Sequence, residues 1–219
     1  MRWVVVVGCT ACGRLAFDEI AAAPDGPSDG PGVGCEQITF DQVPAGFTII
    51  DNGGTLELTG GQVHFSIPGT LNSDVYLQRT DAGSFVGRTV AIQVVSPSLI
   101  FGASTGFGWH EQNGERIGVH MEMDGLNLKL NQYNSTLDQY TEFVAQPYDP
   151  VAFGWWRLRS EDELAILAEV SSDGVVWNPF GTVTGRDLAL MKWDVGMGAY
   201  TTAVAPSEAT VDNASDCKP

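Results

Sequence analysis

Residues 115–133 read ERIGVHMEMDGLNLKLNQY, and this stretch decides the fold class. Apolar and polar side chains alternate on both sides of Asp124-Gly125, a pair that favours the positive φ angles of a two-residue hairpin turn. The stretch therefore predicts two antiparallel strands with one buried face and one outward face. The predicted core face holds Ile117, Val119, Met121, Met123, Leu126, Leu128 and Leu130. The predicted outward face holds Arg116, His120, Glu122, Asn127, Lys129, Asn131 and Tyr133.

Similar short alternating runs extend along the chain on both sides of this hairpin. FTII (47–50), TLELT (55–59), QVHFSIP (62–68) and RTVAIQVV (88–95) precede it, and WWRLR (155–159) and LAILAEV (164–170) follow it. Turn-forming residues separate the runs, and no window shows the period of a long amphipathic helix. The 26 glycines and the 17% of charged residues are also typical of short strands joined by tight turns. The prediction is an antiparallel, all-β domain.

The charge of the chain excludes one class of partner. Lys and Arg number 11 against 27 Asp and Glu, so the net charge is -16. Such a charge repels phosphate backbones and gives no broad attraction to anionic membranes. Nucleic acid is therefore excluded as a partner, and the 219 residues suit one domain with a substantial core.

The first residues resemble a bacterial lipoprotein signal. Met1-Arg2 carries a positive charge, residues 3–8 form an apolar run, and Cys9 and Cys12 follow within VVVVGCTACGR (4–14). In such signals a cysteine after small residues is lipidated and begins the mature chain. We expect lipidation of Cys12, because this choice leaves an even number of cysteines and an apolar region closer to the usual length. Cys9 is the alternative, and a wrongly assigned start codon is a third explanation.

The signal predicts an extracytoplasmic protein, anchored by lipid to the bacterial cell envelope. The apolar run is too short to span a bilayer, so the membrane is a partner only through the lipid anchor. Residues 1–12 form the signal and residues 13–34, rich in Pro and Gly, form a tether. Residues 35–217 are expected to form the folded domain.

Residues 153–183, FGWWRLRSEDELAILAEVSSDGVVWNPFGTV, resemble a pattern of the concanavalin A-like lectin and glucanase superfamily. In that pattern a W-x-R-x-R strand precedes an apolar strand and a Ser-x-Asp-Gly-x-x-Trp turn. The matching residues are Trp155, Arg157, Arg159, Ser172 (or Ser171), Asp173, Gly174 and Trp177. The ending ATVDN (209–213) resembles the closing strand of the same domains. The resemblance implies a jelly roll, an antiparallel β-sandwich of two sheets.

The resemblance also implies two links between the ends of the domain. The first and last strands of a jelly roll are neighbours, so Cys35 and Cys217 are expected to form a disulfide. Domains of this superfamily often hold a structural calcium ion between these strands, and Asp41 and Asp212 are the candidate ligands. Calcium needs about six to eight oxygens, so turn capping by both acids is the alternative. No cofactor is required for the expected function.

The catalytic pattern of the superfamily is incomplete in this chain. Enzymatic relatives carry their carboxylates on one strand in a motif E-x-D-x-x-E. The nearest match is EMDGLN (122–127), in which Asn127 stands at the position of the last acid. The sequence therefore predicts a non-catalytic, lectin-like, carbohydrate-binding lipoprotein rather than an enzyme. The alternatives are a glycoside hydrolase, a polysaccharide lyase that uses His120 with Tyr133, and a structural or adhesive envelope protein.

The predicted glycan site combines cations, amides and an aromatic ring on outward strand faces, a mixture that suits sugar hydroxyls or carboxylates. If the strands that carry these residues share one sheet, the residues form one polar groove. The alternative is an ordinary solvated surface on which Glu122 pairs with a cation across the ladder. The candidate residues are Arg116, His120, Glu122, Lys129, Asn131, Tyr133, Trp155, Arg157 and Arg159.

Overall fold

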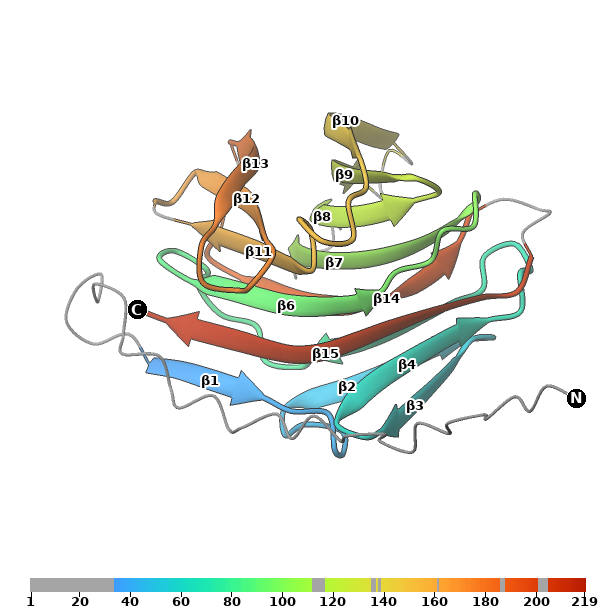
Figure 1. Cartoon of the computed structure of the whole chain (residues 1–219). Helices are drawn as coiled ribbons and strands as arrows, with labels where there is room; N and C mark the ends of the chain where they lie inside the picture. The colour runs from blue at the N-terminus through green and yellow to red at the C-terminus, as the bar shows by residue number, and fades with distance from the viewer. Residues whose placement is uncertain are drawn as a thin grey trace, which may run out of the picture. The chain divides into compact units, whose positions relative to one another are not determined.

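The computed structural model describes residues 34–111, 117–134, 137, 139–160, 162–185, 188–200 and 205–219. All regular elements in these ranges are β-strands, and they form two antiparallel sheets (Figure 1). The all-β, two-sheet prediction is therefore confirmed. The predicted signal with Cys9 and Cys12, the tether up to residue 33, and Arg116 lie outside the described residues. No helix within the described ranges is long and apolar enough to cross a membrane.

One sheet has eight strands and contains the two ends of the described chain. Its order is β13 (Asn178–Thr184), β12 (Ala165–Ser171), β11 (Trp155–Ser160), β6 (Thr89–Ser96), β15 (Ser207–Lys218), β4 (Gln62–Ile67) and β3 (Thr55–Thr59). The eighth strand, β1 (Gly34–Ile38), pairs with the C-terminal half of β15. The first and last strands are thus neighbours, as expected for a jelly roll.

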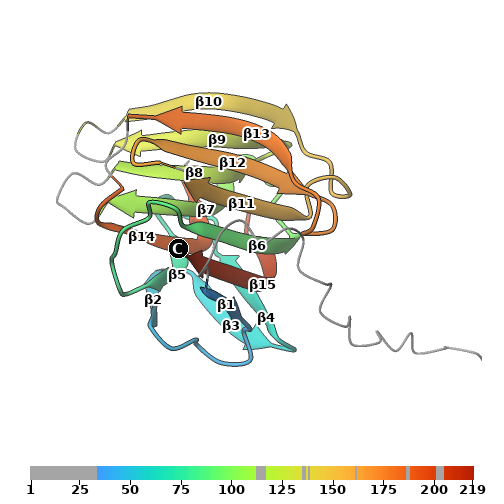
Figure 2. The same cartoon turned by 90° about the vertical axis from the view of Figure 1, so that its left-hand side faces the viewer.

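The other sheet has seven strands and carries the candidate site. Its order is β10 (Gln139–Pro147), β9 (Asn127–Asn134), β8 (Ile117–Asp124), β7 (Ala103–Glu111), β14 (Met191–Ala199), β5 (Asp74–Arg79) and β2 (Phe47–Asn52). The edge strand β10 contacts β13 of the first sheet, and Figure 2 shows both strands along the same side of the sandwich.

The core lies between the sheets because alternate residues of each strand turn inward. Trp109, Trp156 and Trp193 are fully buried there among aliphatic and methionine side chains. Burying so much apolar surface is the main stabilisation of the sandwich, at about 25 cal/mol per Å². The residues left on the outer faces of the strands are therefore available for other roles.

The hairpin of β8 and β9 forms with its turn one residue later than predicted. Asp124 pairs with Asn127, so the two turn residues are Gly125, at a φ of 62°, and Leu126. A glycine with positive φ at the first turn position is typical of a type II′ turn. The prediction that Leu126 belongs to the core is consequently wrong, because its side chain is 72% exposed. Val119, Met121, Met123, Leu128 and Leu130 are buried as predicted.

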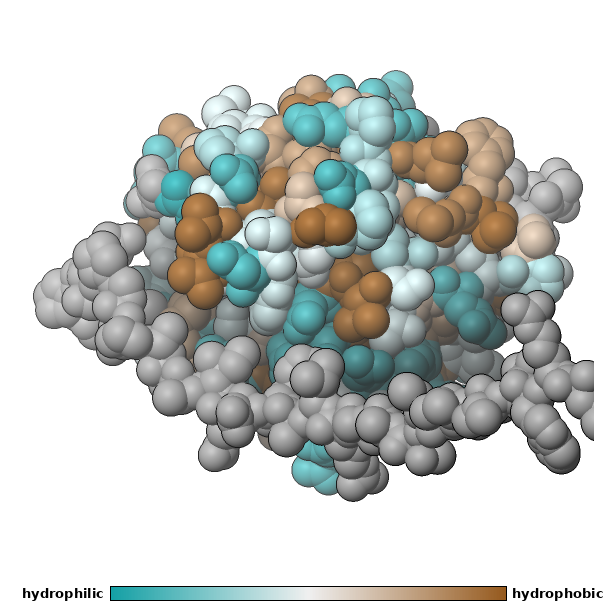
Figure 3. All heavy atoms as spheres, in the orientation of Figure 1, coloured by the Kyte–Doolittle hydropathy of each residue, from teal (hydrophilic) through white to brown (hydrophobic). Residues whose placement is uncertain are grey.

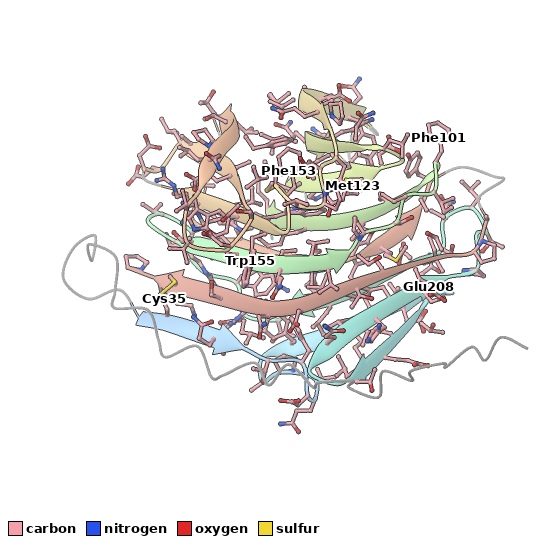
Figure 4. The ribbon with its side chains drawn as sticks, in the orientation of Figure 1. Cys35, Phe101, Met123, Phe153, Trp155 and Glu208 are labelled. Carbon is pink, nitrogen blue, oxygen red and sulfur yellow. A yellow bond between two sulfur atoms is a disulfide. The ribbon has the colours of Figure 1, made fainter. Side chains whose placement is uncertain are left out.

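The disulfide between Cys35 and Cys217 is present (Figure 4). Cys35 on β1 lies directly opposite Cys217 on β15, with the two Cα atoms 4.0 Å apart. This short separation lies within reach of a disulfide, whereas about 7 Å would exclude one. The predicted link between the domain ends is confirmed.

The turn between β12 and β13 shows which serine takes the serine place of the predicted motif. The Ser171 hydroxyl accepts hydrogen bonds from the backbone N–H groups of Asp173 and Gly174, at 3.2 and 2.9 Å. The carboxylate of Asp173 in turn accepts the N–H groups of the next two valines. Ser171, rather than Ser172, therefore closes the turn.

The two candidate calcium ligands both lie near the start of β4. Asp212 accepts a hydrogen bond of 3.2 Å from the Gln62 amide and one of 2.8 Å from the Asn213 backbone. The Asp41 carboxylate lies beside Gly61 in the preceding turn. Within the described residues no group of three acidic, histidine or cysteine side chains could hold a metal ion. Two carboxylates fall far short of the ligand number that calcium needs.

Candidate functional site

Glycines form the floor of a groove on the outer face of the seven-stranded sheet. They occupy outward positions of three adjacent central strands, where each would otherwise present a side chain. These residues are Gly106 and Gly108 on β7, Gly196 and Gly198 on β14, and Gly118 on β8. A Cβ atom on Gly108 would lie 2.2 Å from His120 Cδ2, and one on Gly196 would lie 2.4 Å from Tyr76 Cδ1. The missing side chains thus make room for the rings of the neighbouring strands.

The groove has a volume of about 790 Å³ and crosses the strands from Tyr140 on β10 to Ile50 on β2. A second hollow of about 280 Å³ lies beside β1 and residues 39–44, and its lining contains neither an aromatic ring nor an imidazole. Binding sites are commonly the larger cavity with converging polar groups. We therefore place the candidate site in the groove.

One side of the groove floor holds a chain of three ionisable groups. Asp194 lies opposite Gly108, and Gly108 lies opposite His120 on the next strand. His110 Nε2 lies 2.8 Å from Asp194 Oδ2, and His110 Nδ1 lies 3.5 Å from His120 Nε2. Gln78 donates a further hydrogen bond of 3.3 Å to Asp194.

These contacts shift the protonation of Asp194 and His120 in a consistent way. Burial alone would raise the pKa of Asp194, but the charge and hydrogen bond of His110 outweigh it and hold this pKa below its usual range. Burial, followed by the nearby charge of His110, lowers the pKa of His120 to about 3. At neutral pH the chain therefore contains an ionised Asp194 and an uncharged His120.

A second carboxyl group of the groove floor, that of Glu122, has the opposite environment. Glu122 is 9% exposed and accepts hydrogen bonds from the amide of Asn131, at 3.1 Å, and from the hydroxyl of Ser104. Burial raises the pKa of Glu122, and these two neutral donors offset that effect only in part. Burial thus favours the protonated form of Glu122.

Lys129 lies opposite Glu122 in the strand register but bonds elsewhere. Its ammonium group donates to Asp124 at 2.7 Å and lies 3.4 Å from the Glu142 carboxylate. Tyr200 donates its hydroxyl to the same Asp124. The predicted alternative, in which Glu122 pairs with a cation across the ladder, is therefore wrong. Lys129 is bound instead by Asp124 and Glu142, and its charge lowers the pKa of Glu122 less than burial raises it.

Aromatic side chains lie at both ends of the polar floor. Tyr133 on β9 and Tyr140 on β10 stack with ring centroids 4.5 Å apart and an angle of 27°. At the other end, the ring of Tyr76 lies over the glycines of β14. Burial, and then the charges of Asp194, Asp74 and Glu122, raise the Tyr76 pKa, so its hydroxyl stays a donor.

The structure brings together five of the nine predicted binding residues and separates three others. His120, Glu122, Lys129, Asn131 and Tyr133 lie on β8 and β9 in or beside the groove. Trp155, Arg157 and Arg159 lie on β11 of the other sheet, and Trp155 is labelled in Figure 4. The predicted single groove across these strands is therefore wrong. Strand alternation separates inward from outward residues but does not tell which sheet a strand joins.

On β11 the outward cations are bound by protein groups. Arg157 and Arg159 both donate to Glu169 on β12, at 2.7 and 2.8 Å. The Arg157 guanidinium also lies 4.1 Å from the centre of the Trp177 ring. Figure 3 shows polar and apolar residues interspersed over the face that it presents. Such ion pairs and cation–π contacts between neighbouring strands are typical of structural side chains on a sheet surface.

Sequence reasoning missed several residues of the groove, among them Asp74, Tyr76, His110 and Asp194. A signal for this face was present in GFGWH (106–110) and DVGMGAY (194–200). In each, glycine recurs at every second position between apolar residues. Period-2 glycines leave one face of a strand without side chains, which indicates a close approach of other groups.

Comparison with known proteins supports the fold. A scan against protein families and a search of curated proteins find no match. A prokaryotic β-1,3-1,4-glucanase (lichenase) from a mouse hindgut metagenome aligns over 83% of this chain and 98% of its own, with 12% identity and a TM-score of 0.60. The fold is that of the jelly-roll glucanases. The predicted concanavalin A-like sandwich is thereby confirmed.

Two further solved structures share this jelly roll. The Crh5 transglycosylase covers 83% of each chain at 11% identity and a TM-score of 0.62. The CBM2 module of the evolved Dit protein of Lactobacillus casei BL23 phage J-1 covers 83% of this chain and 94% of its own, at 11% identity and a TM-score of 0.58. Identities this low establish the fold and not the activity.

Proposed function

We propose that this chain hydrolyses glycosidic bonds of a glycan bound in the groove, with Glu122 as general acid and Asp194 as the ionised carboxylate. One observation carries the proposal: two buried carboxyl groups of one groove have opposite partners. Glu122 is held by neutral donors, whereas Asp194 is held by His110. Two carboxyl groups whose environments shift their pKa values in opposite directions are typical of a catalytic acid and base pair.

The proposal revises the expectation of a non-catalytic module. That expectation depended on Asn127 at the last position of a one-strand motif. In the structure Asn127 pairs with Asp124 at the hairpin turn, so residues 122–127 do not form one continuous strand. The candidate carboxylates instead come from β8 and β14, which β7 separates. A missing acid at position 127 therefore does not exclude catalysis.

The placement of the two carboxyl groups favours direct attack of a water molecule on the anomeric carbon of the sugar. Two strand spacings, about 10 Å, separate β8 from β14, and Glu122 is level with Gly196, two residues along the strand from Asp194. The two backbones therefore lie about 12 Å apart, and the side chains cover part of this distance. Glycosidases that invert the anomeric carbon have carboxyl groups about 6.5–9.5 Å apart, which leaves room for a water molecule. Glu122 would protonate the leaving oxygen, and Asp194 would take a proton from the attacking water. The water supplies the hydroxyl group of the new reducing end.

The remaining groove residues suit a sugar chain. The stacked rings of Tyr133 and Tyr140 offer an apolar surface for a pyranose, and the glycine floor lets the chain approach the backbone. The glucanase and transglycosylase with the same fold act on carbohydrates by their names, which supports a glycan as ligand. The acidic residues of the groove, among them Asp74 and Glu111, disfavour a polyuronate and hence a lyase.

The test is release of reducing ends from neutral β-glucans, galactans and chitin oligosaccharides. We expect the wild type to cleave one class, and Glu122→Gln to lose at least about 100-fold in kcat, as for loss of a general acid. Asp194→Asn should also lose activity, whereas Asp212→Asn, which lies outside the groove on β15, should not. Thermal melting of each variant shows that it is folded. A wild type that cleaves none of these glycans, or a fully active Glu122→Gln, refutes the proposal.

A second candidate function is non-catalytic glycan binding in the same groove. The fold shared with the phage CBM2 module supports it. In that case a glycan array would show binding by the wild type and by Glu122→Gln alike, without release of reducing ends. For either function we propose the location predicted from the first residues, a lipid anchor at Cys12 in a bacterial envelope.

A further inference from the structure

We propose that Gly106 determines which sugars the groove accepts: the neutral pyranose ring next to the cleaved bond lies directly over this glycine, and the Tyr76 hydroxyl donates a hydrogen bond to it. This inference rests on the proposed function, because it takes the bond to be cleaved between Glu122 and Asp194. Gly106 and Tyr76 take no part in the proton transfers, and their role is to admit and hold the sugar.

The strand register places Gly106 beside both carboxyl groups. On β7, Gly106 lies directly opposite Glu122 of β8 on one side and Gly196 of β14 on the other. Asp194 lies two residues along β14 from Gly196 and is paired with Gly108. Only β7 lies between the two strands that carry the carboxyl groups. A sugar held between Glu122 and Asp194 therefore lies over Gly106 or over Gly108.

Of these two positions, Gly106 is the open one. A Cβ atom on Gly108 would lie 2.2 Å from His120 Cδ2, so the imidazole already occupies that place. A Cβ atom on Gly106 would have one neighbour within 4 Å among the described residues beyond its own chain neighbours, the Met121 backbone oxygen at 4.0 Å. Gly106 is accordingly partly exposed, whereas Gly108 is buried. The bare backbone at Gly106 is thus left for a ligand.

Tyr76 borders this open space on the side away from Glu122. Four residues form one row across β5, β14, β7 and β8, namely Tyr76, Gly196, Gly106 and Glu122. A Cβ atom on Gly196 would lie 2.4 Å from Tyr76 Cδ1, and one on Gly198 would lie 3.0 Å from the Tyr76 hydroxyl oxygen. The tyrosine ring therefore covers β14, and its hydroxyl ends over Gly198, the diagonal neighbour of Gly106 at about 8 Å.

The charges around this space favour a neutral sugar. Burial, and then the charges of Asp194, Asp74 and Glu122, raise the pKa of Tyr76, so its hydroxyl keeps its proton and donates. A sugar hydroxyl accepts such a bond without adding charge, whereas the carboxylate of a uronic acid would be repelled by the same acidic groups. The space over Gly106 therefore suits an uncharged pyranose.

The experiment fills the space by substitution at position 106 in the full chain. Gly106 lies in a strand without a positive φ, so Gly106→Ala and Gly106→Val should melt at or above the temperature of the wild type. The probes are cellohexaose, laminarihexaose and chitohexaose. Binding is measured by calorimetry in a Glu122→Gln background, and KM by release of reducing ends in the parent chain. Both constants should rise with side-chain size, by at least about 10-fold in Gly106→Val.

Gly83→Val is the matched control. A Cβ atom on Gly83 also has no neighbour within 4 Å among the described residues, and Gly83 does not line the groove. Its dissociation constant and KM should equal those of the parent. Tyr76→Phe keeps the ring and removes the hydroxyl, so it should weaken binding about 5-fold without a change in melting temperature. Wild-type affinity in Tyr76→Phe would exclude the proposed hydrogen bond.

The outcomes separate this inference from the proposed function. Unchanged binding and KM in Gly106→Val overturn the inference even if the parent cleaves a glycan. A lowered melting temperature in Gly106→Val also overturns it, since the space would then not be open. If the parent binds a hexasaccharide without cleaving it and Gly106→Val abolishes that binding, the hydrolysis fails and the subsite stands. If no probe is bound or cleaved, both are refuted.

Discussion

Replacement of Asp216 by asparagine tests how the sandwich tolerates buried charge. Asp216 lies on β15 with no exposed surface. Its carboxylate accepts hydrogen bonds from two atoms of Arg88, from Arg79 at 3.2 Å and from the indole of Trp193 at 3.0 Å. Arg79 and Arg88 are themselves 7% and 2% exposed. One carboxylate therefore contacts two buried guanidinium groups.

The size of the destabilisation by Asp216→Asn depends on which carboxylate partners each arginine keeps. Arg79 also contacts Glu36 at 2.7 Å and Asp81 at 2.6 Å, so it keeps a carboxylate after the change. The only carboxylate that contacts Arg88 within the described residues is Asp216. Removing one partner of a buried ion pair costs about 3–5 kcal/mol. Asp216→Asn should therefore lower the free energy of unfolding by about 4 kcal/mol.

The assay is urea unfolding of the oxidised protein at pH 7, followed by tryptophan fluorescence. With an m-value of about 2 kcal/mol per M, the midpoint should fall by about 2 M. Asp212→Asn is the matched control, because it lies on the same strand and accepts its side-chain hydrogen bond from a neutral amide. Its cost should stay below about 1 kcal/mol. A midpoint for Asp216→Asn equal to that of the control refutes the reasoning.

Two further predictions concern pH and processing. Between pH 6.5 and about 3 the unfolded chain binds a proton at His120 that the folded chain does not. The free energy of unfolding therefore decreases as the pH is lowered through this range. Urea unfolding should show a loss of about 2 kcal/mol from pH 7 to 5 in the wild type that His120→Gln lacks; equal losses contradict the lowered pKa. Mass spectrometry of membrane-extracted native protein should find the chain beginning at lipidated Cys12, and an unmodified N-terminus would exclude the anchor.

Local pattern determined much of the fold. Alternation in the hairpin correctly assigned Val119, Met121 and Met123 to the core, because successive strand residues must face opposite sides. Glycine at the turn was also predicted, and only the turn position was off by one. The cysteines at the domain ends were paired correctly, since a jelly roll places its first and last strands together.

The candidate site was decided by tertiary structure. Asp194 lies 84 positions after His110 in the chain, yet β14 and β7 are neighbours in the sheet and the two side chains meet. Strand alternation put both Glu122 and Arg157 outward, and only the sheet order shows that they belong to different sheets. Period and propensity are local properties of a strand. The partners of a strand depend instead on how the whole core is packed, so a groove lined by all seven strands of one sheet is set only when the chain has folded.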